Sequence, residues 1–165
     1  MAGPQTAWDA IRARIPLTPP WSIDELLAWV AEDTGRVVDL QPWAESANVD
    51  RARTHCGVVA GYADRWVIRF DGRRSRTSRL QTIGHEIGHI LAGHGAGEGR
   101  SLIDASTAQL TYGLNLDGLR YVLGRSSYSD AAEAEAEFIG SKLASYTVGD
   151  LGHAGAHGRL RTTFQ

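Results

Sequence analysis

One segment decides how the chain is interpreted: it reads Thr82-Ile83-Gly84-His85-Glu86-Ile87-Gly88-His89-Ile90-Leu91-Ala92-Gly93-His94 and contains the pattern H-E-x-x-H. Two histidines four positions apart on a helix project side by side, so their imidazoles can bind one cation. Glu86 then lies beside the water that such a cation activates. The pattern predicts a zinc centre with His85 and His89 as ligands and Glu86 as general base.

A helix over this segment is expected on independent grounds. Ser78 and Gln81 have the spacing of a capping box, and Gly93 is typical of a helix end. Apolar residues recur between them at helical spacing: Leu80, Ile83, Ile87, Ile90 and Leu91. Gly84 and Gly88 would each cost about 1 kcal/mol relative to alanine in a helix. We therefore expect a close backbone approach at these two glycines.

Composition limits the classes of protein that fit. A chain of 165 residues with 42% hydrophobic and 22% charged residues can bury one core but not two ordinary ones. We expect one domain over residues 1–148 and a loosely ordered tail over 149–165. Cys56 is the only cysteine, which excludes an intrachain disulfide and suggests a buried strand thiol. Since no apolar stretch resembles a signal peptide or a membrane span, a cytoplasmic location is expected.

The remaining pattern predicts an α+β fold. Helices are expected over residues 7–15, from the capping box of Ser22 and Glu25 to Gly35, and from Ser129 or Asp130 to about Tyr146. The last helix has a predicted buried face: Ala132, Ala136, Ile139 and Leu143. Strands are expected over 36–40, 55–61 and 66–70, the last two as a hairpin, and one or two short helices over 102–123. We therefore predict a small antiparallel sheet packed with the histidine helix.

A catalytic zinc normally has three protein ligands and one open position, so a third ligand is expected after His89. The candidates are His94, Glu98, Asp104, Glu133, Glu135, Glu137, His153 and His157. His94 ends the predicted helix, where we expect a partner for the helix C-terminus or a cleft-wall residue. Glycines around His153 and His157 disfavour a helix there, and we assign that pair to the tail.

Glu133 is the strongest candidate because it borders the buried stripe of the last predicted helix. Its alternative role is the N3 residue of a capping box with Asp130. Glu135 is expected to face water. Glu137, one turn after Glu133, is either a solvated residue or the acceptor for the second N–H of a ligand histidine.

Two motifs together resemble the ImmA/IrrE metallopeptidases: residues 82–94 and the segment Glu133-Ala134-Glu135-Ala136-Glu137-Phe138-Ile139-Gly140-Ser141-Lys142-Leu143. Members of that family show a similar H-E-L-G-H helix and a later helix of the form E-x-x-A-[N/D/E]-x-[F/W]-A-x-x-L. The resemblance implies a zincin-like fold in which Glu133 is the third zinc ligand. Ile139 stands where the family usually has an aromatic residue, and Gly140 where it has alanine.

These residues predict a zinc-dependent endopeptidase. Zn²⁺ would lower the pKa of its water toward about 7, and Glu86 would take a proton from that water and pass it to the leaving nitrogen. An oxyanion donor is also needed, and the candidates are Tyr112, Tyr121, Tyr128 and His94.

The resemblance implies a protein substrate, such as a helix-turn-helix repressor of a mobile element or stress regulon encoded nearby. The alternative is a noncatalytic zinc-containing module that binds a protein, for example in a toxin–antitoxin pair. Only a short arginine cluster favours DNA binding: Arg73, Arg74, Arg76 and Arg79. A formal charge of −2 adds no support, and we expect neither a nucleic-acid nor a membrane partner.

Overall fold

The structure, a computed structural model, describes residues 3–43, 57–94, 111, 113–123 and 128–151. Its elements in chain order are α1 (Pro4–Arg14), β1 (Trp21–Ser22), α2 (Ile23–Thr34), β2 (Val37–Pro42), β3 (Val58–Gly61), β4 (Arg65–Phe70), α3 (Arg76–Leu91), β5 (Tyr121–Leu123), α4 (Asp130–Tyr146) and β6 (Thr147–Val148). The predicted α+β class is confirmed.

The main sheet has the strand order β2-β4-β3-β5. The predicted hairpin is present, because β3 and β4 pair antiparallel with Gly61 opposite Trp66. The prediction of a purely antiparallel sheet is wrong, because β2 runs parallel to β4. The tight turn fixes only the β3–β4 pairing, whereas α2 delivers β2 to the other side of β4. The sheet is therefore mixed.

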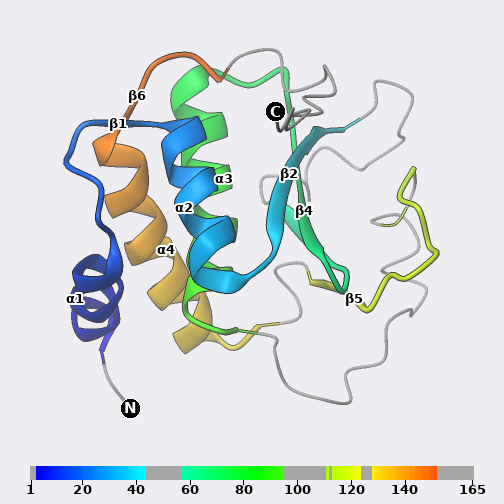
Figure 1. The fold of residues 1–165 in the computed structure, drawn as a ribbon, viewed down its shortest axis with the longest axis horizontal. Helices are drawn as coiled ribbons and strands as arrows, with labels where there is room; N and C mark the ends of the chain where they lie inside the picture. Colours follow the sequence, from blue (N-terminus) through cyan, green and yellow to red (C-terminus); the bar gives the residue numbers. More distant parts are fainter. Residues whose placement is uncertain (1–2, 44–56, 95–110, 112, 124–127, 152–165) are drawn as a thin grey trace, which may run out of the picture.

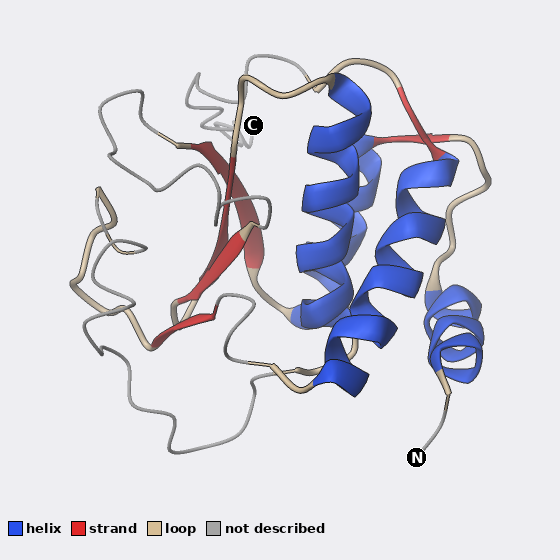
Figure 2. Cartoon of the chain, turned by 180° about the vertical axis from the view of Figure 1, so that it is seen from behind, coloured by secondary structure: helices blue, strands red, loops and turns tan. Residues whose placement is uncertain are grey.

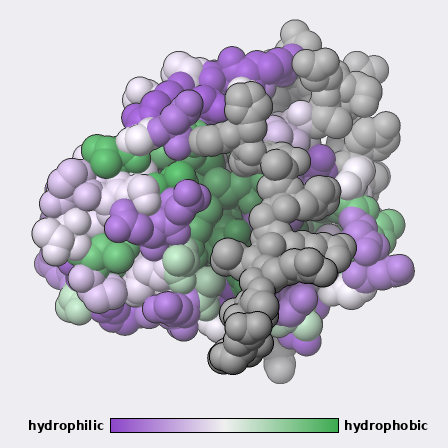
Figure 3. Space-filling model, turned by 45° about the horizontal axis from the view of Figure 1, so that its top comes forward, coloured by the Kyte–Doolittle hydropathy of each residue, from purple (hydrophilic) through white to green (hydrophobic). Residues whose placement is uncertain are grey.

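All the helices lie on one side of the main sheet (Figures 1 and 2). α2 and α3 lie nearest the strands, α4 packs on α3, and α1 lies farthest out against α4. The core fills the space between these layers, with Val30, Ile68, Ile83, Ile87 and Ile139 fully buried. Figure 3 shows hydrophobic side chains gathered in a recess that hydrophilic residues border. The sheet therefore supports α3, which supports α4.

The interface between α3 and α4 has almost no side chains at its centre. A Cβ on Gly84 would lie 2.7 Å from the carbonyl oxygen of Gly140, and one on Gly88 would lie 2.7 Å from that of Ala136. A Cβ on Gly140 would lie 2.5 Å from the backbone nitrogen of His85. The expected close backbone approach at Gly84 and Gly88 is confirmed, and α4 is the partner.

Short elements tie the far ends of α2 and α4 together. β1 pairs with β6 in parallel, and the indole N–H of Trp21 donates to Thr147 Oγ1 at 3.1 Å. The predicted capping box of α2 is present: Ser22 Oγ accepts the N–H of Glu25, whose carboxylate accepts the N–H of Ser22. Gly35 ends α2 with φ 71°, in the left-handed region. The start of α2 is thus held against the end of α4.

Four local predictions need correction. α3 is capped by Ser75, whose Oγ accepts the N–H of Ser78, so the helix begins a turn before the predicted box. In the region predicted as short helices, residues 121–123 form strand β5, because they extend the sheet beside β3. Leu151 is buried at 5% exposure, so the predicted loose tail does not begin at residue 149. Ala132 is only half-buried, whereas the other three residues of the predicted α4 face are buried.

Other predictions lie outside the described residues, including the strand environment of Cys56 and the segments 95–110 and 152–165. None of the described helices combines the length and the apolar character needed to cross a bilayer.

Replacing Gly140 by alanine tests the helix interface. The added methyl would meet the backbone of α3, so the free energy of unfolding should fall by about 1–3 kcal/mol, despite the better helix propensity of alanine. Urea denaturation measures this change. The control is Ser141→Ala on the exposed side of the same turn, which should stay within about 0.5 kcal/mol of the parent. A Gly140→Ala protein as stable as the parent would show that the two backbones do not touch.

Candidate metal centre

Three predicted ligands converge where the end of α3 meets the start of α4. His85 Nε2 and His89 Nε2 lie 3.1 Å apart. Glu133 Oε1 lies 3.3 Å from His89 Nε2, and Glu133 Oε2 lies 3.6 Å from His85 Nε2. Among the described residues these three side chains form the only His, Cys, Asp or Glu group with donors close enough to hold a metal ion. The structure therefore brings together the three residues that the sequence predicted.

The spacing of the donor atoms fits a small cation. Zinc bonds of 2.0–2.1 Å at tetrahedral angles would separate neighbouring donors by about 3.3 Å. The two imidazole nitrogens lie 3.1 Å apart, Glu133 Oε1 lies 3.3 Å from His89 Nε2 and Glu133 Oε2 lies 3.6 Å from His85 Nε2, and one donor atom from each residue lies within 4.8 Å of the others. The donor set of two imidazoles and one carboxylate is also that of a catalytic site with an open position. The group could thus hold a metal ion without rearranging its helices.

His89 is the most buried ligand, with 1% of its surface exposed. Burial, with the neighbouring His85 and His94, lowers the pKa of His89 to about 3. The imidazole is therefore neutral at neutral pH, which is the form that binds a metal. Tyr128 covers it, with ring centroids 3.6 Å apart and planes inclined by 12°.

Glu86 lies on α3 between His85 and His89, and its carboxyl group is buried at 2% exposure. A Cβ on Gly57 would lie 2.7 Å from Glu86 Cγ, so the glycine before β3 leaves the space that this side chain occupies. Burial, and then the charge of Glu133, raise the pKa of Glu86 to about 8. Its Oε2 has no hydrogen-bond partner among the described residues. This role of Gly57 has no local sequence pattern, because the residue that it contacts lies 29 positions later.

Glu137 approaches the second nitrogen of His85, as one of its two predicted roles required. His85 Nδ1 and Glu137 Oε2 lie 3.2 Å apart, but the atoms are not aligned as a hydrogen bond. The Glu137 side chain is 73% exposed, so water screens the pair.

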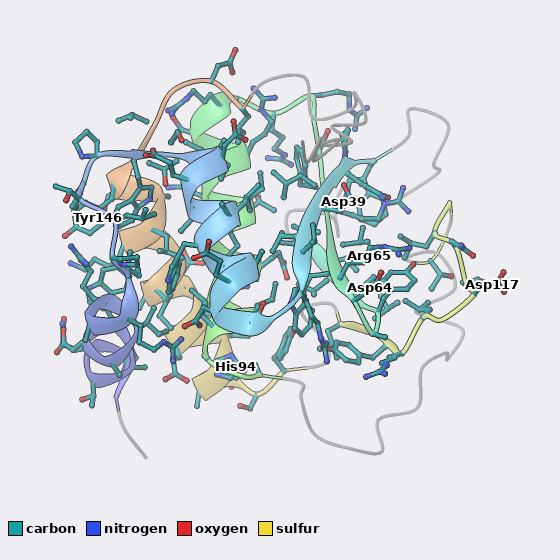
Figure 4. The ribbon with its side chains drawn as sticks, in the orientation of Figure 1. Asp39, Asp64, Arg65, His94, Asp117 and Tyr146 are labelled. Atoms are coloured by element: carbon teal, nitrogen blue, oxygen red, sulfur yellow. The ribbon has the colours of Figure 1, made fainter. Side chains whose placement is uncertain are left out.

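The prediction that Glu135 faces water is wrong. Its carboxylate contacts His94 Nε2 at 2.8 Å, and 24% of the side chain is exposed. His94 in turn lies 3.0 Å from His89, between their Nδ1 atoms. Figure 4 shows His94 at the end of α3 that meets the start of α4, far from Tyr146 at the other end of α4. The apolar pattern of α4 predicts a single inward face, whereas the turn after α3 brings His94 to the side of α4 that carries Glu135.

Among the remaining candidate ligands and oxyanion donors, the structure describes Tyr121 and leaves five others outside the described residues. Tyr121 packs away from the ligands, with its ring 5.9 Å from that of Trp66 and directly beneath Gly61. Tyr112, Glu98, Asp104, His153 and His157 lie outside the described residues.

The arginine cluster is at the opposite end of α3. Arg73 forms a bidentate ion pair with Asp71, and Arg74 lies 3.9 Å from the same carboxylate. Arg76 donates to the carbonyl oxygen of Gly149. Part of the cluster's charge is therefore paired within the fold.

Comparisons of the chain with protein families, with curated proteins and with solved structures found no match. The case for the site therefore depends on its own geometry.

Metal binding can be tested directly. The purified chain should hold about one divalent ion, because three ligands and an open position form a complete site. Glu133→Ala and His85→Ala should each lose it. Glu32→Ala, which removes an exposed carboxylate on α2, should keep it. Metal analysis after dialysis against a weak chelator measures the content, and equal retention in all four proteins would refute the assignment.

Proposed function

We propose that this chain is a zinc-dependent endopeptidase of the zincin type, with His85, His89 and Glu133 as ligands and Glu86 as general base. The observation that carries the proposal is the buried Glu86 carboxyl group, whose Oε2 has no hydrogen-bond partner among the described residues, on the same helix as two of the three side chains that could hold a metal ion. The resemblance to ImmA/IrrE metallopeptidases supports the same assignment of residues.

The donor chemistry favours zinc over harder cations. Calcium and magnesium prefer six or more oxygen ligands, whereas this site offers two imidazole nitrogens and one carboxylate. His89 is held neutral by burial, so no proton has to leave it before a metal binds. Zinc in this position supplies Lewis acidity, which polarises a peptide carbonyl and makes water a nucleophile near neutral pH.

Glu86 is suited to proton transfer. A carboxyl group with a pKa raised to about 8 by burial and by Glu133 holds its proton well at neutral pH. A cation at the ligands would lower that pKa toward the working range of a base. Glu86 Oε2 would then accept a proton from the attacking water and return it to the leaving nitrogen.

Tyr128 is the best-placed oxyanion donor among the described residues. It stacks on His89, whereas Tyr121 is in the sheet and His94 is engaged by His89 and Glu135. Its phenol would donate to the developing negative charge on the carbonyl oxygen.

The substrate that we propose is a protein, and by the resemblance a helix-turn-helix repressor encoded near this chain. Such a substrate would approach from the side of His85 and Glu133, because 13% and 18% of these side chains are exposed. A zinc-bound partner module without cleavage is the competing outcome of the experiments below.

Glu86→Gln separates catalysis from binding. The amide keeps the size of the side chain but cannot accept the proton, so turnover should fall by about 10²–10⁴-fold while zinc content stays unchanged. The assay incubates the zinc-loaded protein with the repressor encoded beside it and follows cleavage by mass spectrometry. Full cleavage by the variant would exclude Glu86 as base. Tight binding of the repressor without cleavage by either protein would favour the noncatalytic module.

Tyr128→Phe tests the oxyanion donor. The ring remains to stack on His89, so zinc content should be retained, and loss of the hydroxyl should reduce turnover by about 10²–10³-fold. Tyr121→Phe is the matched control, since that ring packs on the sheet and should leave turnover unchanged. If both variants turned over at the parental rate, the donor would have to come from elsewhere.

A further inference from the structure

Three side chains form a chain of contacts that leads away from the proposed metal. Glu135 Oε2 lies 2.8 Å from His94 Nε2, and His94 Nδ1 lies 3.0 Å from His89 Nδ1. His89 then presents its other nitrogen, Nε2, to His85 and Glu133. The exposed fractions of the Glu135, His94 and His89 side chains are 24%, 13% and 1%, so water competes little for these contacts.

The backbone holds His94 in this position. Gly93 has φ 72°, the N–H of His94 donates to the carbonyl of His89 at 3.0 Å, and the N–H of Gly93 donates to that of Ile90 at 3.1 Å. This pair of bonds is a Schellman motif, which brings the second residue after the helix back over its last turn. The residues in contact are usually apolar, but here they are two imidazoles. The contact of His94 with His89 is therefore set by the way that α3 ends.

The direction of the hydrogen bonds follows from the donors and acceptors present. A carboxylate only accepts, so the proton between Glu135 and His94 is on His94 Nε2. With a single ring proton, which Glu135 holds at Nε2, His94 accepts at Nδ1, and the shared proton of the two histidines is then on His89 Nδ1. His89 is left with its lone pair on Nε2, the nitrogen that faces His85 and Glu133. The Glu135 carboxylate, at the end of this network, thus determines the tautomer of His89, which lies two contacts away.

We propose that Glu135 and His94 are positioning residues that hold His89 as its Nδ1–H tautomer and thereby direct its Nε2 lone pair at the metal. The inference rests on the proposed zinc site and adds two residues to it. Glu133 and Glu135, two positions apart on α4, act on opposite nitrogens of the same imidazole. One would share the metal with it and the other would fix its proton.

The two ligand histidines differ in how they are supported. His85 has Glu137, which is 73% exposed and poorly aligned. His89 has a continuous and mostly buried network. We therefore assign the larger effect on metal affinity to Glu135 and His94, and a smaller one to Glu137.

The experiment measures zinc affinity by competition with a chelating dye. Glu135→Gln and His94→Phe should weaken binding by about 10–100-fold, the usual effect of losing such a partner. Glu137→Gln should weaken it at most about threefold, as for an exposed ion pair. Glu32→Gln, which changes an exposed carboxylate on α2 outside this contact network, should match the parent. His94→Asn should restore most of the affinity that His94→Phe loses, because the asparagine oxygen can accept the proton of His89 Nδ1.

Nitrogen-15 NMR of the histidine side chains supplies a readout that a purely structural role would not move. In the parent, His89 should be protonated at Nδ1 and His94 at Nε2. His94→Phe should shift His89 toward its Nε2–H tautomer, and His94→Asn should return it.

The outcomes separate the two proposals. A parent protein that binds no zinc would overturn the proposed function and this inference with it. A parent that binds zinc, with unchanged affinity in Glu135→Gln and in His94→Phe, would overturn the inference alone. A parent in which His89 carries its proton on Nε2 would also overturn it, and thermal melting of each metal-free variant identifies any that fail to fold.

Discussion

The contact between the backbones of α3 and α4 is the constraint on which the rest of the site depends. Gly84 contacts the backbone of Gly140, and Gly88 contacts that of Ala136, so the contact repeats after one turn of both helices. The helices therefore run antiparallel in a fixed register. One further turn along each helix brings the end of α3 to the start of α4. Glu133 and Glu135 reach the histidines because the glycines allow the two helix axes to come this close.

Charging the buried Glu86 carboxyl group near Glu133 costs free energy, and a cation bound beside them would remove that cost. Glu86 and Glu133 are close enough for each other's charge to matter, and the surroundings of Glu86 are apolar. With its pKa raised from the ordinary 4.5 to about 8, Glu86 in the folded protein keeps a proton that the unfolded chain would release between those values. The stability that Glu86 contributes to the metal-free protein is fully present below pH 4.5 and is lost as the pH rises to about 8. A cation held by His85, His89 and Glu133 would offset the loss, because it would stabilise both carboxylates and bind only the folded state.

The parts of the structure that the sequence predicted are those with local causes. The capping box of Ser22 and Glu25, the stop at Gly35 and the extent of α4 each depend on residues within a few positions. The side-by-side placement of His85 and His89 was predictable for the same reason, because four-residue spacing on a helix fixes it. The parallel direction of β2 depends on where α2 packs, and no pattern within the strand encodes that. The role of Glu135 was missed because it needs the register of two helices and the turn at Gly93 together.

The candidate ligands and Glu86 are held more rigidly than Tyr128, which covers His89. The ligands and Glu86 belong to two helices that are locked by backbone contact, and His94 is fixed by a helix-ending motif. Such supports resist small displacements, because either helix would have to move as a whole. Tyr128 lies instead just before α4, where its ring stacks on that of His89 and lies 6.3 Å from that of His94. A substitution at Tyr128 would therefore alter the surface beside the candidate site, whereas changes along the glycine interface would displace the candidate ligands themselves.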